Sequence, residues 1–167
     1  MRITPINSCV CLTIFILLFA CTKTSPKTSI GDVILPPDPS ETGKATLVGV
    51  DSDSDGVRDD IQRYIALTYP DKPEIQKALR QFAKASQDYI LHGDDPIKAR
   101  EAALKEDKAI ECLHSRDSEN ASVIFRKIHA EFLNTKERIL ANDKVDSLLS
   151  GQVFPSAKDR AKSCNDN

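Results

Sequence analysis

A short acidic segment carries the residue types and spacing best suited to chemistry in this 167-residue chain. Carboxylates at alternate positions 1, 3 and 5 of a tight loop converge on one point, and a glycine at position 6 permits the turn. The carbonyl of residue 7 and the side chain of residue 9 then add to the about six to eight oxygens that calcium binds. The segment supplies these oxygens from Asp51, Asp53, Asp55, Val57 and Asp59, with Gly56 as the glycine. The spacing therefore predicts a calcium-binding loop.

The last ligand position of this loop departs from the usual pattern. Position 12 is Gln62, whose amide oxygen is a weaker and neutral ligand, and Asp60 is the substitute that the sequence offers. The pattern resembles the calcium loops of EF-hands, dockerins and thrombospondin type 3 repeats, in which position 12 is acidic. That resemblance covers the loop and not a fold. We expect one structural calcium ion of modest affinity, about 10⁻⁴–10⁻³ M, at the start of the folded domain.

A second interpretation of the same residues needs no metal. Asp59 would cap the helix that follows, Gln62 would close a capping box, and residues 51–55 would form a solvated acidic turn. Against this, three alternate aspartates without a cation repel one another. Capping and metal binding are also compatible, so both interpretations remain open at the level of the sequence.

The beginning of the chain is typical of an export signal. Arg2 is its only charge, and the run from Val10 to Ala20 is apolar apart from Thr13 and one cysteine. This run is too short for a membrane span, which needs about 20 apolar residues. The segment Leu18-Phe19-Ala20-Cys21 resembles the lipobox of bacterial lipoproteins. That resemblance implies cleavage after residue 20, lipid on the Cys21 thiol and anchoring of the protein to a membrane.

The compartment follows from the same resemblance. Thr22 stands where an aspartate would favour retention at the inner membrane, so we expect the periplasmic face of the outer membrane. The alternative is an ordinary secretory signal followed by a chance cysteine. In either case the compartment is oxidising, and the two cysteines beyond residue 21, Cys112 and Cys164, are predicted to form a disulfide rather than to stay as free thiols.

Composition divides the rest of the chain into a tether and a helical domain. Residues 21–46 are rich in Ser, Thr, Lys and Pro and predict a flexible tether. In residues 47–167, apolar residues recur with helical spacing and no long alternating segment predicts a strand. We expect an all-α fold, a small bundle of four to five helices. The predicted helices span residues 60–68, 73–91 after a cap at Asp71, 96–114 after a cap at Asp95, 121–139, and a shorter stretch that ends at Gly151.

Charge and motif content narrow the functional classes. The formal net charge is −2, which provides no basic footprint for nucleic acid. The charged run from Lys98 to Lys108 is interpreted as a solvated helix face. No catalytic motif is recognised, so we expect a non-enzymatic envelope lipoprotein that binds a protein partner or supports an assembly. The alternatives are a periplasmic enzyme with dispersed active-site residues and a pilotin-like secretion chaperone.

Overall fold

Helical periodicity of the apolar residues dominates the architecture, as predicted. The computed structural model describes residues 29–30 and 33–165. Its helices are α1 (Asp59–Thr68), α2 (Pro73–Leu91), α3 (Pro96–Arg116), α4 (Ala121–Phe132) and α5 (Lys136–Leu148), with 3₁₀ turns η1 (Ser40–Lys44) and η2 (Arg160–Ser163). Two-residue strands, β1 (Ser29–Ile30) and β2 (Val33–Ile34), pair antiparallel. The predicted all-α class is confirmed. The predicted signal and Cys21 lie outside the described residues.

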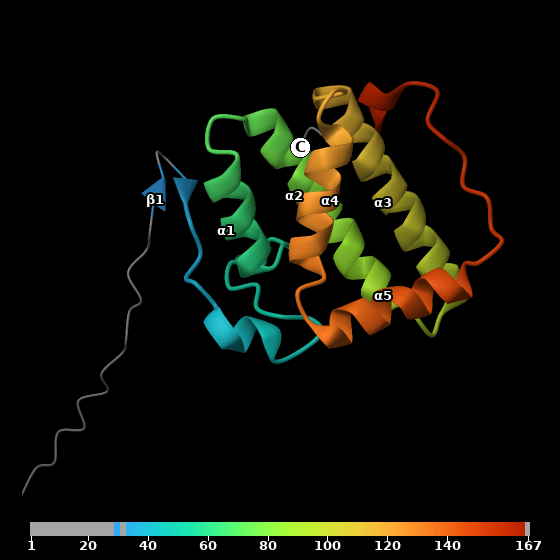
Figure 1. Ribbon diagram of the computed structural model, residues 1–167, viewed down its shortest axis with the longest axis horizontal. Coiled ribbons are helices and arrows are strands. Elements are labelled where there is room, and N and C mark those ends of the chain that lie inside the picture. Colours follow the sequence, from blue (N-terminus) through green and yellow to red (C-terminus); the bar gives the residue numbers. More distant parts are fainter. Residues whose placement is uncertain (1–28, 31–32, 166–167) are drawn as a thin grey trace, which may run out of the picture.

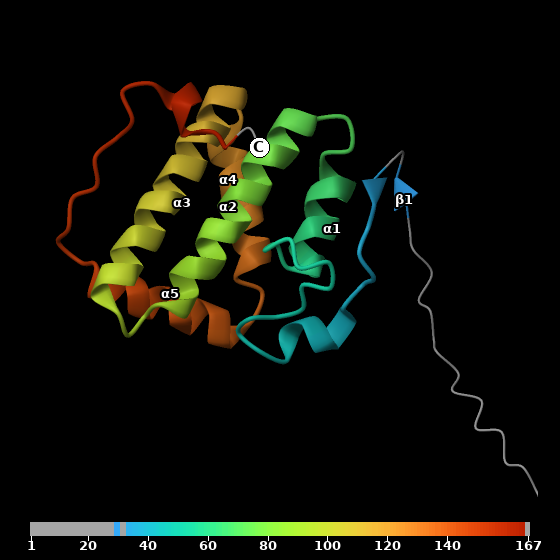
Figure 2. The ribbon, with the colours of Figure 1, turned by 180° about the vertical axis from the view of Figure 1, so that it is seen from behind.

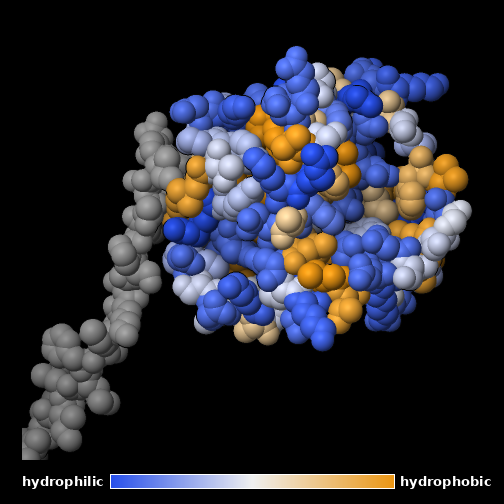
Figure 3. Space-filling view, in the orientation of Figure 1, coloured by the Kyte–Doolittle hydropathy of each residue, from blue (hydrophilic) through white to orange (hydrophobic). Residues whose placement is uncertain are grey.

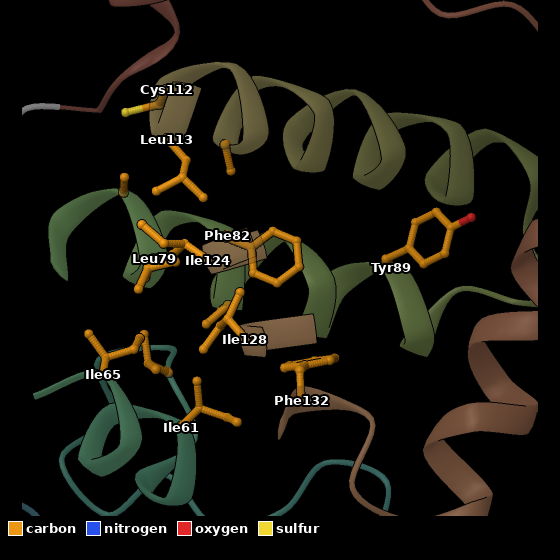
Figure 4. Packing of buried hydrophobic residues seen from close by; sticks show 14 of the residues in the cluster. Ile61, Ile65, Leu79, Phe82, Tyr89, Cys112, Leu113, Ile124, Ile128 and Phe132 are labelled. Carbon is orange, nitrogen blue, oxygen red and sulfur yellow. The ribbon is translucent and has the colours of Figure 1, made fainter. Parts of the chain in front are cut away.

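The helices enclose one core. Helices α1 to α4 run alongside one another, and α5 crosses below them near one end of α2 and α3 (Figures 1 and 2). Figure 4 shows Phe82 of α2 at the centre, among side chains from α1, α3 and α4. The ring of Phe82 meets the Phe125 ring edge-on, with 5.3 Å between centroids. Burial of one such side chain contributes about 1.5–3 kcal/mol, so this core is the main source of stability.

Of the two predicted helix caps, one is confirmed and the other is wrong. The cap at Asp95 is confirmed, because its Oδ1 accepts hydrogen bonds from the N–H groups of Ile97 and Lys98, both at 3.1 Å. The cap at Asp71 is wrong, because Lys72 is the residue before α2 and no side chain caps this helix. Pro73 begins α2 and has no N–H to satisfy, which lowers the need for a cap.

The predicted single helix over residues 121–139 is also wrong. Helix α4 ends at Phe132 and α5 begins at Lys136, with Thr135 accepting a hydrogen bond from the Arg138 N–H at 3.2 Å. Ile139, the last residue of that predicted helix, lies on α5 and is 46% exposed. The inner position of the first turn of α5 belongs instead to Arg138, which has no exposed surface.

The chain packs onto the domain earlier than the predicted tether boundary. Leu35 is buried, and the Pro36 carbonyl accepts a hydrogen bond from Arg63 of α1 at 2.8 Å. The guanidinium of Arg138 then donates to the carbonyls of Gly43, Thr46 and Leu47, at 2.7, 3.0 and 3.4 Å. Residues 35–46 lack apolar periodicity, so the sequence gives no sign of this attachment. It depends on backbone carbonyls and one buried arginine.

The predicted disulfide is confirmed. Cys112 of α3 and Cys164 after η2 are bonded. The bridge holds the end of the chain against α2, where the Gln81 side chain donates to the Ser163 carbonyl at 2.8 Å and accepts from the Asn165 N–H at 2.9 Å. None of the helices in the described residues is long and apolar enough to cross a membrane.

Candidate metal centre

The acidic loop brings three of its carboxylates together at the start of α1. Oxygen atoms of Asp51, Asp53 and Asp59 all lie within 4.8 Å of one another. Two oxygens that share a calcium ion at about 2.3–2.6 Å are at most about 5 Å apart, so the separation suits a shared ion. Gly56 has a φ of +85°, a conformation open to glycine, and it makes the turn that the spacing predicts. Asp51 holds this turn by accepting from the Gly56 N–H at 2.9 Å.

Asp59 is the most deeply buried of the three carboxylates. Its residue is 1% exposed, and its Oδ1 accepts a hydrogen bond from the Ser52 N–H at 2.9 Å. The carboxylate thus faces back into the loop, and Arg58, not Asp59, occupies the N-cap position of α1. The interpretation of Asp59 as a helix cap is therefore wrong. The carboxylate is oriented toward Asp51 and Asp53 instead.

No basic side chain offsets the three converging carboxylates directly. Within the part of the chain that the structure describes, neither Asp51, Asp53 nor Asp59 forms an ion pair. Arg80 of α2 pairs with the neighbouring carboxylate of Asp55. Burial lowers the pKa of Arg80, and the negative charges of Asp53 and Asp51 oppose this effect. The charges of the loop therefore act on the pKa of Arg80, but its ion pair is with Asp55.

Asp55 lies outside the group of three. One of its oxygens meets Arg80, and the other accepts a hydrogen bond from the Val57 N–H at 2.7 Å. Val57 itself has a fully buried side chain, which fixes the end of the loop to the core. Asp55 would need to leave Arg80 before it could reach an ion shared by the other carboxylates.

Asp60 serves a different group of residues. Its carboxylate accepts two hydrogen bonds from Arg58, at 3.0 and 2.8 Å, and one from Asn134 at 2.9 Å. Burial acts to raise the pKa of Asp60, but Arg58, Asn134 and Arg138 together hold it below the ordinary value. Arg58 and Arg138 are both almost fully buried, so Asp60 is their balancing anion. The structure thus separates Asp60 from the converging carboxylates.

Gln62 lies at the site, and of its side-chain amide only the nitrogen has a hydrogen-bond partner among the described residues. The residue is 7% exposed, and its Nε2 donates to Asp53 at 3.1 Å. Its Oε1 is buried and has no hydrogen-bond partner among the residues that the structure describes. A buried polar atom without a partner costs about 1–3 kcal/mol, which marks this amide as incompletely satisfied.

A second cluster of titratable groups, which no sequence motif indicates, lies between α2, α3 and α5. Ser86 donates to Glu106 at 2.5 Å, and the Tyr89 hydroxyl donates to Asp146 at 2.5 Å. Tyr89, Glu106 and Asp146, with Asp107, Leu149 and Phe154, line a hollow of about 230 Å³. Burial raises the pKa of Glu106 to about 7, against the Ser86 hydrogen bond and with support from the charges of Asp107 and Asp146.

Comparison with known proteins yields no match. No protein-family model, no curated protein and no solved structure is significantly similar to the chain. Function is therefore inferred from the chemistry of the residues described above.

Proposed function

We propose that the loop from Asp51 to Gln62 binds one calcium ion in a lipid-anchored, non-enzymatic protein of the cell envelope. The observation that carries the calcium site is the burial of Asp59 beside Asp51 and Asp53 without an ion pair to any described residue. Several carboxylates held close together with one of them out of solvent are unfavourable. A divalent cation supplies the missing charge, and calcium accepts an irregular set of oxygens.

The ligand set follows from the loop positions. Asp51, Asp53 and Asp59 already converge and bind directly. A half-turn of the Gln62 amide exchanges the places of Nε2 and Oε1, which turns the unpartnered oxygen toward the side of Asp53. The Val57 carbonyl and Asp55 follow from the sequence pattern, and Asp55 joins only when it leaves Arg80. These rearrangements oppose binding, so we expect an affinity of about 10⁻⁴–10⁻³ M.

The proposed ion has a structural role at the start of the folded domain. The Asp59 N–H donates to the Val50 carbonyl at 2.8 Å, so the two ends of the loop are already in contact. The segment before the loop is fixed to Arg138, and the segment after it is α1. Calcium would therefore hold the segment before the loop against α1 of the helical bundle and reduce the motion of the loop between the two.

The anchor and the partner surface complete the proposal. The lipobox resemblance supports a lipid on Cys21, with the domain at the periplasmic face of the outer membrane. On the folded part, Ile139 and Leu140 of α5 are 46% and 56% exposed. Apolar residues gather over the region of α4 and α5 on one face (Figure 3). Exposed apolar surface of this kind favours a protein partner.

Asp59→Asn tests the calcium site. The amide keeps the shape and can still accept from Ser52, but it removes a negative charge from the group of three. In EDTA the full-length variant should melt at a higher temperature than the wild type, because carboxylate repulsion is relieved. Calcium at about 5 mM should raise the melting temperature of the wild type and leave that of the variant nearly unchanged.

The matched control is Asp71→Asn, the same change at an exposed aspartate outside the loop. It should respond to calcium like the wild type. Isothermal titration calorimetry supplies the dissociation constant directly. If the wild type shows no binding heat up to about 5 mM calcium, which lies above the expected range, the loop is not a calcium site.

A further inference from the structure

A groove between α2 and α3 gathers basic side chains that are dispersed in the sequence. The two helices lie side by side in both views (Figures 1 and 2). The groove has a volume of about 340 Å³, and its polar lining consists of Gln81, Lys84, Asp88, Lys105, Lys108 and Asn165. A neighbouring hollow of about 150 Å³ shares Gln81, Lys84 and Asn165 and adds Lys77 and Arg80. The two hollows form one continuous basic surface, which we call the α2–α3 groove.

The charge of this groove is opposite to that of the whole chain. Among the described residues, five lysine or arginine side chains line the two hollows, and Asp88 is the one carboxylate in this lining. Lys105 pairs with Asp88 at 2.8 Å, Lys77 pairs with Glu74 at 3.0 Å, and Arg80 pairs with Asp55. Lys84 and Lys108 have no ion pair among the described residues, and they supply the unpaired positive charge of the groove. The formal net charge of the chain is −2. A local excess of positive charge on an acidic protein indicates a preference for anions at this place.

The C-terminal segment builds one end of the groove and holds it in place. Asn165 contributes to both hollows, and its N–H donates to the Gln81 side chain at 2.9 Å. The bond between Cys112 and Cys164 fixes the residue just before it. The wall of the groove thus combines lysine side chains with Asn165, whose backbone the neighbouring disulfide holds in place.

We propose that the α2–α3 groove binds the phosphate group of a small anionic ligand, with Lys84 and Lys108 as its principal contacts. Several lysine side chains lining one hollow suit a compact anion with many acceptor oxygens, since each lysine offers three donors. The volume of the groove matches the low end of small-molecule sites, about 300–1,000 Å³. The phosphate belongs either to a soluble phosphate ester or to the headgroup of an anionic phospholipid, which share this chemistry.

Calorimetric titration of the full-length protein tests the proposal. The probes are glycerol 3-phosphate and a short-chain phosphatidylglycerol kept below its micelle concentration, and EDTA excludes any contribution from calcium. We expect millimolar or tighter binding of at least one probe, and the stronger probe identifies the source of the phosphate. Combined replacement Lys84→Ala and Lys108→Ala should weaken binding by at least about tenfold, because two charge-assisted hydrogen bonds are lost.

The matched control variant removes two positive charges outside the groove. Lys127→Ala with Lys136→Ala changes two exposed lysines on α4 and α5, outside the groove. This variant should keep the wild-type affinity. Equal weakening in both variants would show a general electrostatic effect, and the absence of binding by either probe at about 10 mM and low ionic strength would also overturn the proposal.

Discussion

Glu106 makes the stability of the domain depend on pH in an unusual direction. Burial raises its pKa from the ordinary 4.5 to about 7, aided by the charges of Asp107 and Asp146. The folded state therefore binds this proton more tightly than the unfolded state does. The stabilisation from this group is present in full below about pH 4.5, and it is lost as the pH rises through about 7.

Replacing Glu106 with glutamine should remove this dependence. The amide has nearly the same shape and keeps a hydrogen-bonding atom for Ser86, but it does not ionise. The difference between 4.5 and about 7 corresponds to a ceiling of about 3 kcal/mol. The residue is only partly buried by surface area, so solvent screening lowers the expected gain to about 2 kcal/mol. At pH 8 the variant should thus be more stable than the wild type, by roughly 5–10 °C in melting temperature.

This effect is measured by urea denaturation, followed by circular dichroism, at several pH values between about 4 and 8. The two proteins should have nearly equal stability at pH 4, and the difference should grow between pH 5 and pH 8. Glu101→Gln, the same change at an exposed position of α3, should follow the wild type at every pH. A constant difference between Glu106→Gln and wild type across this range would refute the reasoning, since it would be independent of proton binding.

Three further predictions follow from other contacts. Arg80→Gln should lower the melting temperature in EDTA, because Asp55 loses its ion pair. The same change should enlarge the rise in melting temperature caused by calcium, because Asp55 becomes free to bind the ion. Thermal scans with and without calcium measure both effects. Cys112→Ala with Cys164→Ala should cost up to about 4 kcal/mol of stability in denaturant titrations, and mass spectrometry without reduction should find the two cysteines linked in the wild type. Cys21→Ser should abolish incorporation of labelled palmitate; a wild-type chain that takes up no label would contradict the proposed anchor.

Apolar spacing and proline were enough to predict most of the helices. Ile61 and Ile65 follow the helical period and are buried in α1, and Pro96 follows a true cap at Asp95. The cap at Asp71 failed for a local reason, but the error over residues 121–139 and the unexpected attachment of residues 35–46 involve a polar residue whose partners are distant in the chain. Arg138 looks like a surface residue by type, but it is buried because three carbonyls far upstream accept its hydrogen bonds. Local patterns do not contain that information.

The candidate sites show the same limit. The spacing of the acidic loop predicted that Asp51, Asp53 and Asp59 come together, because the loop is a local structure. It also predicted Asp55 and Asp60 as ligands, and these two carboxylates pair with arginines instead. The partner of Asp55 is Arg80, which is 25 positions away, and no local signal marks it. The basic groove was missed for the same reason, since Lys84 and Lys108 belong to different helices and meet only in the folded chain.

The attachment of residues 35–47 has a mechanical consequence. A force transmitted along the chain from its N-terminal side first meets buried Leu35 and the bond between Arg63 and Pro36. It next meets the three carbonyls that Arg138 holds, and it reaches Asp51 only after these have been released. Tension on the N-terminal segment is therefore borne upstream of the acidic loop. An ion in that loop would keep its geometry while the chain before it is pulled, so its occupancy would report the ion concentration and not the load.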